Sequence, residues 1–312
     1  MARLLPDHRR LARIAVASTV WLAAFLCAAG GRVQAQQQGQ LFMSVLDATG
    51  YPLANLAVGD VTVQVDDVAC KVINVEPFKK PMKLTVMIDN GSAVSNALSN
   101  LRTAVKNLID ALPEGLQIEL LTTAPQPRWL EKFTADHAIL LKAVDRLAPD
   151  SGAGLFFDAL SEAGNRADKD KGEYFPVFLM VASDVGRNSG AMDRDYQKLQ
   201  KQVIDRAITV HFVMFNSGGE RVGGVAGAVQ TEVGLALTKM SGGRYENISA
   251  HTRLVTLLPE LGKQITESNL RQSQQFRITY ERPGKNLKPA QRISAGVTRG
   301  GTPMLSLDGH LP

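Results

Sequence analysis

Two aspartates stand at the ends of apolar runs in this sequence, Asp89 after residues 84–88 and Asp184 just after residues 177–182. Short runs of this kind are typical of buried parallel strands. The loops that follow the carboxyl ends of such strands meet at one edge of the sheet, where ligands bind. Because Mg²⁺ and Ca²⁺ are bound by carboxylate and hydroxyl oxygens, Asp89 and Asp184 are the candidate metal ligands.

The elements that position these aspartates alternate between strands and amphipathic helices from residue 83 to residue 270. This alternation predicts an α/β fold with a doubly wound, mostly parallel, Rossmann-like sheet. Residues 128–133 are expected as an edge strand, and Asp136 is expected to cap a helix. Pro259 is expected to interrupt and kink the last helix, because proline lacks the backbone N–H that a helix interior needs.

Both ends of the chain alternate apolar and polar residues, which is typical of half-buried strands. Residues 36–82 are expected to form an N-terminal β module, bounded by a proline-bracketed hinge at 77–81 through which no central strand should run. Residues 271–312 are expected to form a closing β hairpin. Because so few strands bury little surface alone, we expect the hairpin to pack on the N-terminal module as one small β subdomain.

Three segments together carry a resemblance to a known family. Residues 86–93, VMIDNGSA, resemble the strand and D-x-S-x-S motif of a von Willebrand factor A domain, and residues 178–184, FLMVASD, resemble the strand that ends in its second aspartate. Residues 151–160 resemble the segment that supplies its threonine. The wider organisation is similar to the secreted VWFA-related family described mainly from acidobacteria. This resemblance implies an adhesion or interaction role at the strand-end loops.

The metal-binding motif is incomplete, because Gly91 and Ala93 stand where the family has serines and Gly154 stands where it has threonine. Ser92 and Ser95 are out of register with the motif. Since three hydroxyl ligands are missing, we expect a degenerate site without a cofactor. The alternative is Mg²⁺ or Ca²⁺ bound at a residual site of Asp89 and Asp184.

Two neighbouring carboxylates repel each other unless a cation or hydrogen-bond donors join them. We hypothesise that Arg187, or backbone amides of residues 90–93, takes the place of the metal. The expected ligand face therefore comprises Asn90, Gly91, Ser92, Gly154 and Arg187.

Residues 1–35 have the features of a signal peptide: a basic start, an apolar run from 14 to 30, and small residues before an expected cleavage after Ala35. We therefore expect a secreted or periplasmic protein without a membrane span after cleavage, exported by either the Sec or the twin-arginine route. Cleavage would remove five arginines and one aspartate, so the net charge of +5 falls to +1. A mature chain so close to neutral is not expected to bind nucleic acid.

The remaining sequence contains no recognised catalytic motif. Cleavage would leave Cys70 as the single cysteine, in an alternating stretch where a half-buried, unreactive side chain is expected. The leading hypothesis is a non-enzymatic binding or adhesion module for an unidentified protein or extracellular-matrix ligand. The alternatives are metal-dependent adhesion at Asp89 and Asp184, and a hydrolase with an unrecognised site.

Overall fold

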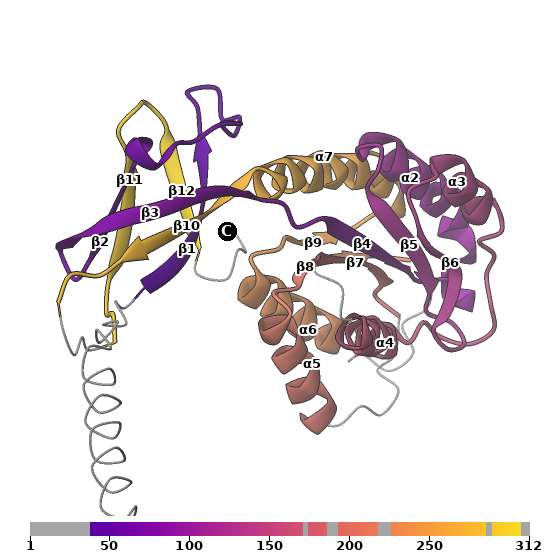
Figure 1. The fold of residues 1–312 in the computed structure, drawn as a ribbon. Coiled ribbons are helices and arrows are strands. Elements are labelled where there is room, and N and C mark those ends of the chain that lie inside the picture. The colour runs from indigo at the N-terminus through magenta and orange to yellow at the C-terminus, as the bar shows by residue number, and fades with distance from the viewer. Residues whose placement is uncertain (1–37, 171–173, 186–192, 218–225, 285–288, 307–312) are drawn as a thin grey trace, which may run out of the picture.

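The computed structural model describes residues 38–170, 174–185, 193–217, 226–284 and 289–306. Two lobes are visible in Figure 1, one of helices around a sheet and one of strands. The signal-peptide prediction, Arg187 and most of the glycine-rich stretch 218–227 lie outside the described residues. Among the described residues, no helix is long and apolar enough to cross a membrane.

The larger lobe contains a six-stranded sheet in the order β6-β5-β4-β7-β8-β9. Its strands are β4 (Met82–Ile88), β5 (Gln117–Thr122), β6 (Arg128–Thr134), β7 (Phe175–Ser183), β8 (Thr209–Phe215) and β9 (Tyr245–Ile248). All neighbours are parallel except β5 and β6, which are antiparallel. The predicted mostly parallel sheet with an edge strand at β6 is therefore confirmed.

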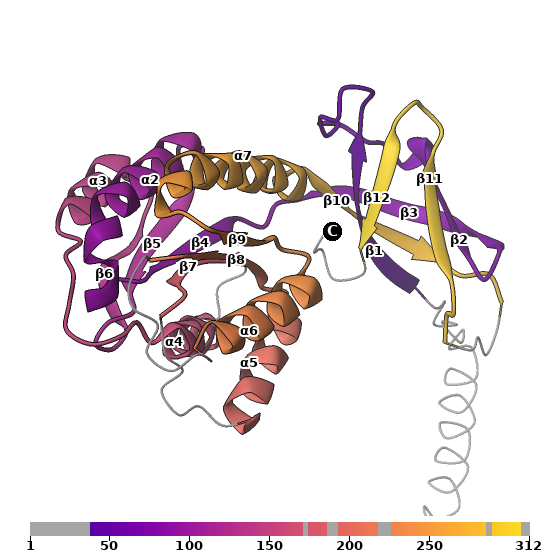
Figure 2. The same cartoon turned by 180° about the vertical axis from the view of Figure 1, so that it is seen from behind.

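Helices cover both faces of this sheet (Figures 1 and 2). One hydrophobic core lies beneath α2 (Leu98–Ala111), α3 (His137–Asp145) and α7 (Leu254–Ser273). A second core lies beneath α4 (Phe156–Lys169), α5 (Asp193–Asp205) and α6 (Ala226–Ser241). The predicted cap of α3 is confirmed, because the Asp136 side chain accepts hydrogen bonds from the backbone N–H groups of Ala138 and Ile139. The 3-10 turns are η1 (Val58–Asp60), η2 (Ser92–Ala97) and η3 (His251–Arg253).

The expected interruption at Pro259 is wrong, because α7 runs without a break from Leu254 to Ser273. Proline removes the N–H that would bond to the carbonyl of Val255, four residues earlier. Asn107 of α2 supplies a replacement, since its Nδ2 donates to that carbonyl at 3.2 Å. Packing against α2 therefore compensates for the proline.

The smaller lobe is a sheet in the order β11-β2-β3-β10-β1-β12, drawn from both ends of the chain. Its strands are β1 (Gln38–Leu46), β2 (Val61–Val65), β3 (Val68–Phe78), β10 (Gln275–Glu281), β11 (Ile293–Val297) and β12 (Thr302–Ser306). The C-terminal strands differ from the expected hairpin. β10 lies between β1 and β3, whereas β11 pairs with β2. Residues 282–292 separate β10 from β11, a connection too long for the short loop of a hairpin.

The expected break at residues 77–81 is also shifted, because β3 continues through Pro77 to Phe78. Pro77 is opposite Phe276 of β10, while β2 pairs only with residues 68–70 of β3. The other side of β3 has no strand partner at Pro77, so the missing N–H is tolerated there. The central sheet then begins at Met82, which pairs with Phe175.

Candidate ligand-binding site

Asp89 is the first residue after β4, at the carboxyl end of the central sheet, and only 2% of its surface is exposed. Its Oδ1 accepts hydrogen bonds from the Gly91 N–H at 2.9 Å and the Thr123 hydroxyl at 3.5 Å. Its Oδ2 accepts from the Ser183 N–H at 3.0 Å and from the Ser183 hydroxyl. Both carboxylate oxygens are thus engaged by protein donors, as buried polar groups require.

The neighbouring residue Asn90 connects the surrounding loops. Its Oδ1 accepts from the Ala124 N–H at 2.9 Å, and its Nδ2 donates to the Ala148 carbonyl at 3.2 Å. Its backbone carbonyl accepts from the Asp150 N–H at 2.7 Å. Asn90 is 3% exposed, so these bonds are shielded from water and hold the loops after β4, β5 and α3 together.

Asp184 follows β7 and is half-buried. Its Oδ1 accepts from both the N–H and the hydroxyl of Ser217, each at 3.1 Å. Its own N–H donates to the Phe215 carbonyl at 3.0 Å, which ties Asp184 to the end of β8. Each of the two predicted aspartates is therefore bonded to a serine of its own.

Gly91, in the loop after β4, lies against Gly154, in the segment just before α4. A Cβ at Gly91 would lie 2.8 Å from the Gly154 N atom, and a Cβ at Gly154 would collide with Asp89 Oδ1 and Thr123 Oγ1. Ser92 joins the same loops, since its N–H and hydroxyl both donate to the Gly152 carbonyl, at 2.9 and 3.2 Å. Neighbouring backbone thus fills the space that a serine side chain would need at position 91, and the Asp89 and Thr123 side chains fill the space that a threonine would need at position 154.

The residues present do not fit a divalent cation. Mg²⁺ requires near-octahedral oxygen ligands, whereas the Asp89 oxygens face N–H and O–H donors. Among the described residues, no group of three or more His, Cys, Asp or Glu side chains is placed to hold a metal ion. Backbone amides of residues 90–93 were hypothesised to take the place of the metal, and one of them, the Gly91 N–H, does donate to Asp89.

Sequence reasoning missed three residues that complete this network: Thr123, Ser183 and Ser217. Ser183 directly precedes Asp184, and Thr123 directly follows the strand that neighbours β4. Parallel neighbours end at the same edge, so both residues could have been found from the predicted strand ends. Ser217 follows β8 and could have been found in the same way.

The comparisons with known proteins concern the fold. No family model and no curated protein matched the sequence. A solved von Willebrand factor type A protein from Catenulispora acidiphila is similar over 88% of this chain and 73% of its own, with a TM-score of 0.51 and 13% identity. The chain has the von Willebrand factor A fold. This A domain is formed by the central sheet and its helices.

Two further solved structures are similar to this chain at TM-scores below 0.5. BatB from Bacteroides thetaiotaomicron matches 60% of this chain and 98% of its own, at 12% identity and a TM-score of 0.45. The von Willebrand factor domain of the pilus tip protein Mfa5 from Porphyromonas gingivalis matches 60% of this chain and 96% of its own, at 10% identity and a TM-score of 0.44.

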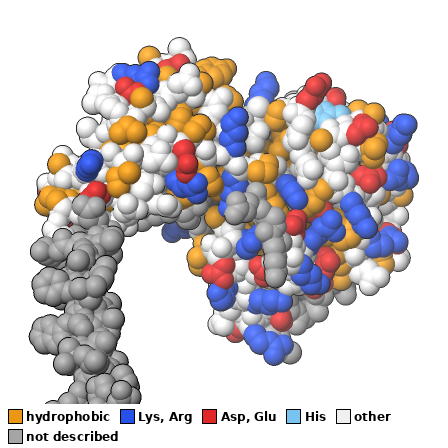
Figure 3. All heavy atoms as spheres, viewed as in Figure 1, with side chains coloured by type: hydrophobic (Ala, Val, Ile, Leu, Met, Phe, Trp, Pro, Cys, Tyr) orange, Lys and Arg blue, Asp and Glu red, His pale blue; other side chains and the backbone are white. Residues whose placement is uncertain are grey.

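Several of the exposed side chains near the described strand ends of the A domain are uncharged. They are Ser92, Ser95, Asn96, Pro125, Gln126 and Ser151. The charged residues beside them, Arg128 and Asp150, form an ion pair with each other. Elsewhere, on the face that Figure 3 shows, Lys and Arg side chains are interspersed with Asp and Glu. Apart from this ion pair, the described parts of the loops after β4, β5 and α3 therefore expose neutral polar groups, which can form hydrogen bonds with a ligand.

Proposed function

We propose that the protein is an exported, non-enzymatic binding module whose A domain presents its strand-end loops to a protein or extracellular-matrix ligand without a bound metal. The observation that carries this proposal is the buried network around Asp89, which joins the loops after β4 and β5 to the end of β7. Loops already held in one arrangement lose little conformational freedom on binding. The network thereby takes the structural place that a cation would have.

The export part of the proposal rests on residues 1–35, whose composition is that of a signal peptide. Sequencing the N-terminus of the protein from the envelope or medium of its source organism tests it. We expect the mature chain to begin at Gln36. A cytoplasmic protein that retains residues 1–35 would contradict export.

The ligand face can be tested with a matched pair of variants. Gln126 is exposed in the loop between β5 and β6, and Gln117 is exposed at the start of β5, at the opposite end of the sheet. We expect Gln126→Arg to weaken capture of a ligand from the native envelope fraction, because a charged side chain then has to be desolvated at the contact. Gln117→Arg should leave capture unchanged.

Circular dichroism of both variants shows whether they fold, and quantitative mass spectrometry measures capture. Ser92→Arg, on the neighbouring loop, should behave as Gln126→Arg does. If folded Gln126→Arg and Ser92→Arg capture the same proteins as strongly as Gln117→Arg does, the strand-end loops are not the ligand face.

A further inference from the structure

A cavity of about 70 Å³ lies at the other end of the central sheet, where its strands begin. Its floor includes Thr209 and His211 of β8, and its roof includes Ser268, Arg271 and Gln272 in the last two turns of α7. A cavity needs roughly 10–15 Å³ of such volume to hold one water, so this one has room for a ligand of about five non-hydrogen atoms. Polar groups from two elements converge on it.

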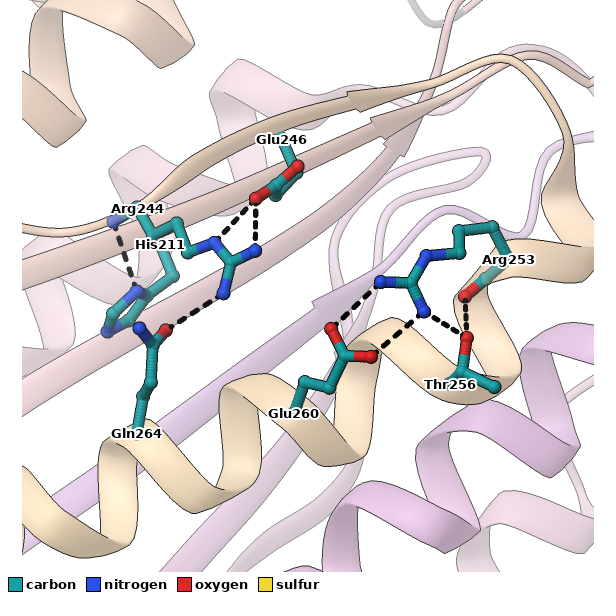
Figure 4. A network of polar contacts seen from close by, with 7 residues as sticks. All are labelled: His211, Arg244, Glu246, Arg253, Thr256, Glu260 and Gln264. Carbon is teal, nitrogen blue, oxygen red and sulfur yellow. Dashed lines mark hydrogen bonds and ion pairs between the residues drawn. The ribbon is translucent and has the colours of Figure 1, made fainter.

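His211 is a hydrogen-bond donor in this cavity. Its Nδ1 accepts from the Arg244 N–H at 3.1 Å, so a neutral ring carries its proton on Nε2. Figure 4 shows Nε2 on the side of the ring turned away from that bond. Burial, and secondarily the charge of Arg244, lower the pKa of His211 to about 4, so the ring is neutral at pH 7.

The neighbours of His211 hold it in place (Figure 4). The Arg244 guanidinium is bound by Glu246 on β9, and its Nη1 donates to Gln264 Oε1 on α7 at 3.3 Å. Arg244 is thus engaged outside the cavity and orients the histidine through its backbone. The ring is fixed between β8 and α7 before any ligand enters.

The roof adds a cation. Arg271 Nη2 donates to the Ser268 hydroxyl at 3.2 Å, which orients the guanidinium, whose other N–H groups remain available as donors. Gln272 is 5% exposed, and its Oε1 has no hydrogen-bond partner among the described residues. An amide can turn to present its NH₂ group instead, so Gln272 can also donate. No carboxylate lines the described part of the cavity.

We propose that this cavity binds one small oxyanion, a carboxylate or inorganic phosphate, held by the Arg271 guanidinium and the Nε2–H of His211. The excess of donors over acceptors and the single positive side chain favour an anion over a neutral molecule. Only Gln274 separates α7 from β10 of the small sheet. The bound anion would therefore fix the end of α7 to the central sheet beside the junction of the two lobes. This site is independent of the proposed ligand face at the opposite end of the sheet.

The test uses the whole mature chain and titrates sodium acetate or sodium phosphate against sodium chloride at constant ionic strength. We expect one of the two oxyanions to raise the melting temperature saturably and to bind with a stoichiometry of one by calorimetry. Arg271→Met should weaken this binding about tenfold or more, because a hydrogen bond to a charged group is lost. Lys263→Met removes an exposed cation from the same helix outside the cavity and should bind as the wild type does.

A direct readout comes from the His211 imidazole signals in nuclear magnetic resonance spectra. The binding oxyanion should shift them in the wild type and in Lys263→Met. If Arg271→Met does not fold, Ser268→Ala takes its place, with weaker binding expected because the guanidinium loses its orienting partner. Titrations with no saturable effect of either oxyanion, unshifted His211 signals, or equal affinity in the folded cavity variant would overturn the proposal.

Discussion

Ser183 donates two hydrogen bonds to one carboxylate oxygen of Asp89, through its backbone N–H at 3.0 Å and through its hydroxyl. The two residues lie at the ends of neighbouring parallel strands, β7 and β4. Because Asp89 is buried, these bonds replace the solvation that its carboxylate loses on folding. We therefore expect stability and the shape of the proposed ligand face to depend on the same contact.

Removing the Ser183 hydroxyl should destabilise the fold. We expect Ser183→Ala to lower the free energy of unfolding by about 1–3 kcal/mol, because a buried acceptor loses one of its donors. Urea denaturation measures this change. Ser92→Ala is the matched control at the same edge of the sheet, since the Ser92 side chain is exposed, and its cost should stay below about 0.5 kcal/mol. Equal costs for the two variants would mean that the Asp89 network adds nothing to stability.

Divalent cations should have no effect on stability. Asp89 already has donors on both oxygens, and backbone fills the space between Gly91 and Gly154. Thermal melting in EDTA, Mg²⁺, Ca²⁺ and Mn²⁺ should therefore give one melting temperature. A metal that raises the melting temperature in a concentration-dependent way, and fails to do so in Asp89→Ala, would favour metal-dependent adhesion instead.

The parts of the fold that depend on local sequence could be predicted. Apolar runs such as residues 177–182 and the cap at Asp136 are set by burial and by nearby backbone, and both elements were found. Strand pairing at the C-terminus was not, because β11 binds β2 from more than two hundred residues away. The continuity of α7 was also missed, since it depends on Asn107 of another helix.

In the candidate site, too, some features could be predicted from local sequence and others were missed. Asp89 and Asp184 were placed at strand ends by the apolar runs before them, and the missing hydroxyls at Gly91 and Gly154 could be read directly. Thr123 and Ser183, which donate to Asp89, were not predicted, although both stand at the ends of the strands that neighbour β4 and could have been found from those strand ends. The proposed role of Arg187 stays a prediction.

Glu119 should make stability depend on pH. Burial raises the pKa of this carboxyl from 4.5 to about 7, against the hydrogen bond from Thr85 and the charge of Arg166. Between those values the unfolded chain is ionised at Glu119 while the folded chain holds the proton. The contribution to stability is therefore complete below pH 4.5 and is lost as the pH rises to 7. A shift of this size corresponds to about 3 kcal/mol.

The measurement is the difference in unfolding free energy between wild type and Glu119→Gln from pH 4 to pH 8. Glutamine can still accept from Thr85 and does not ionise. The unfolding free energy of the variant, relative to that of wild type, should therefore rise between pH 4 and pH 8. Taking the difference cancels His211, whose lowered pKa acts in the opposite direction, with stability lost as the pH falls from 6.5 to 4. A difference that does not change with pH would show that Glu119 ionises normally in the folded protein.

Asn107 and Pro259 should be energetically coupled, although they do not bond to each other. Asn107→Ala removes the donor to the Val255 carbonyl and should cost about 1 kcal/mol of unfolding free energy. In a Pro259→Ala background the restored N–H of residue 259 can bond to that carbonyl, so Asn107→Ala should cost clearly less there. Urea denaturation of the four proteins gives the coupling energy of the cycle. A cost of Asn107→Ala that is the same in both backgrounds would mean that Asn107 does not stand in for the missing N–H, and that α7 tolerates its proline through its packing on α2 alone.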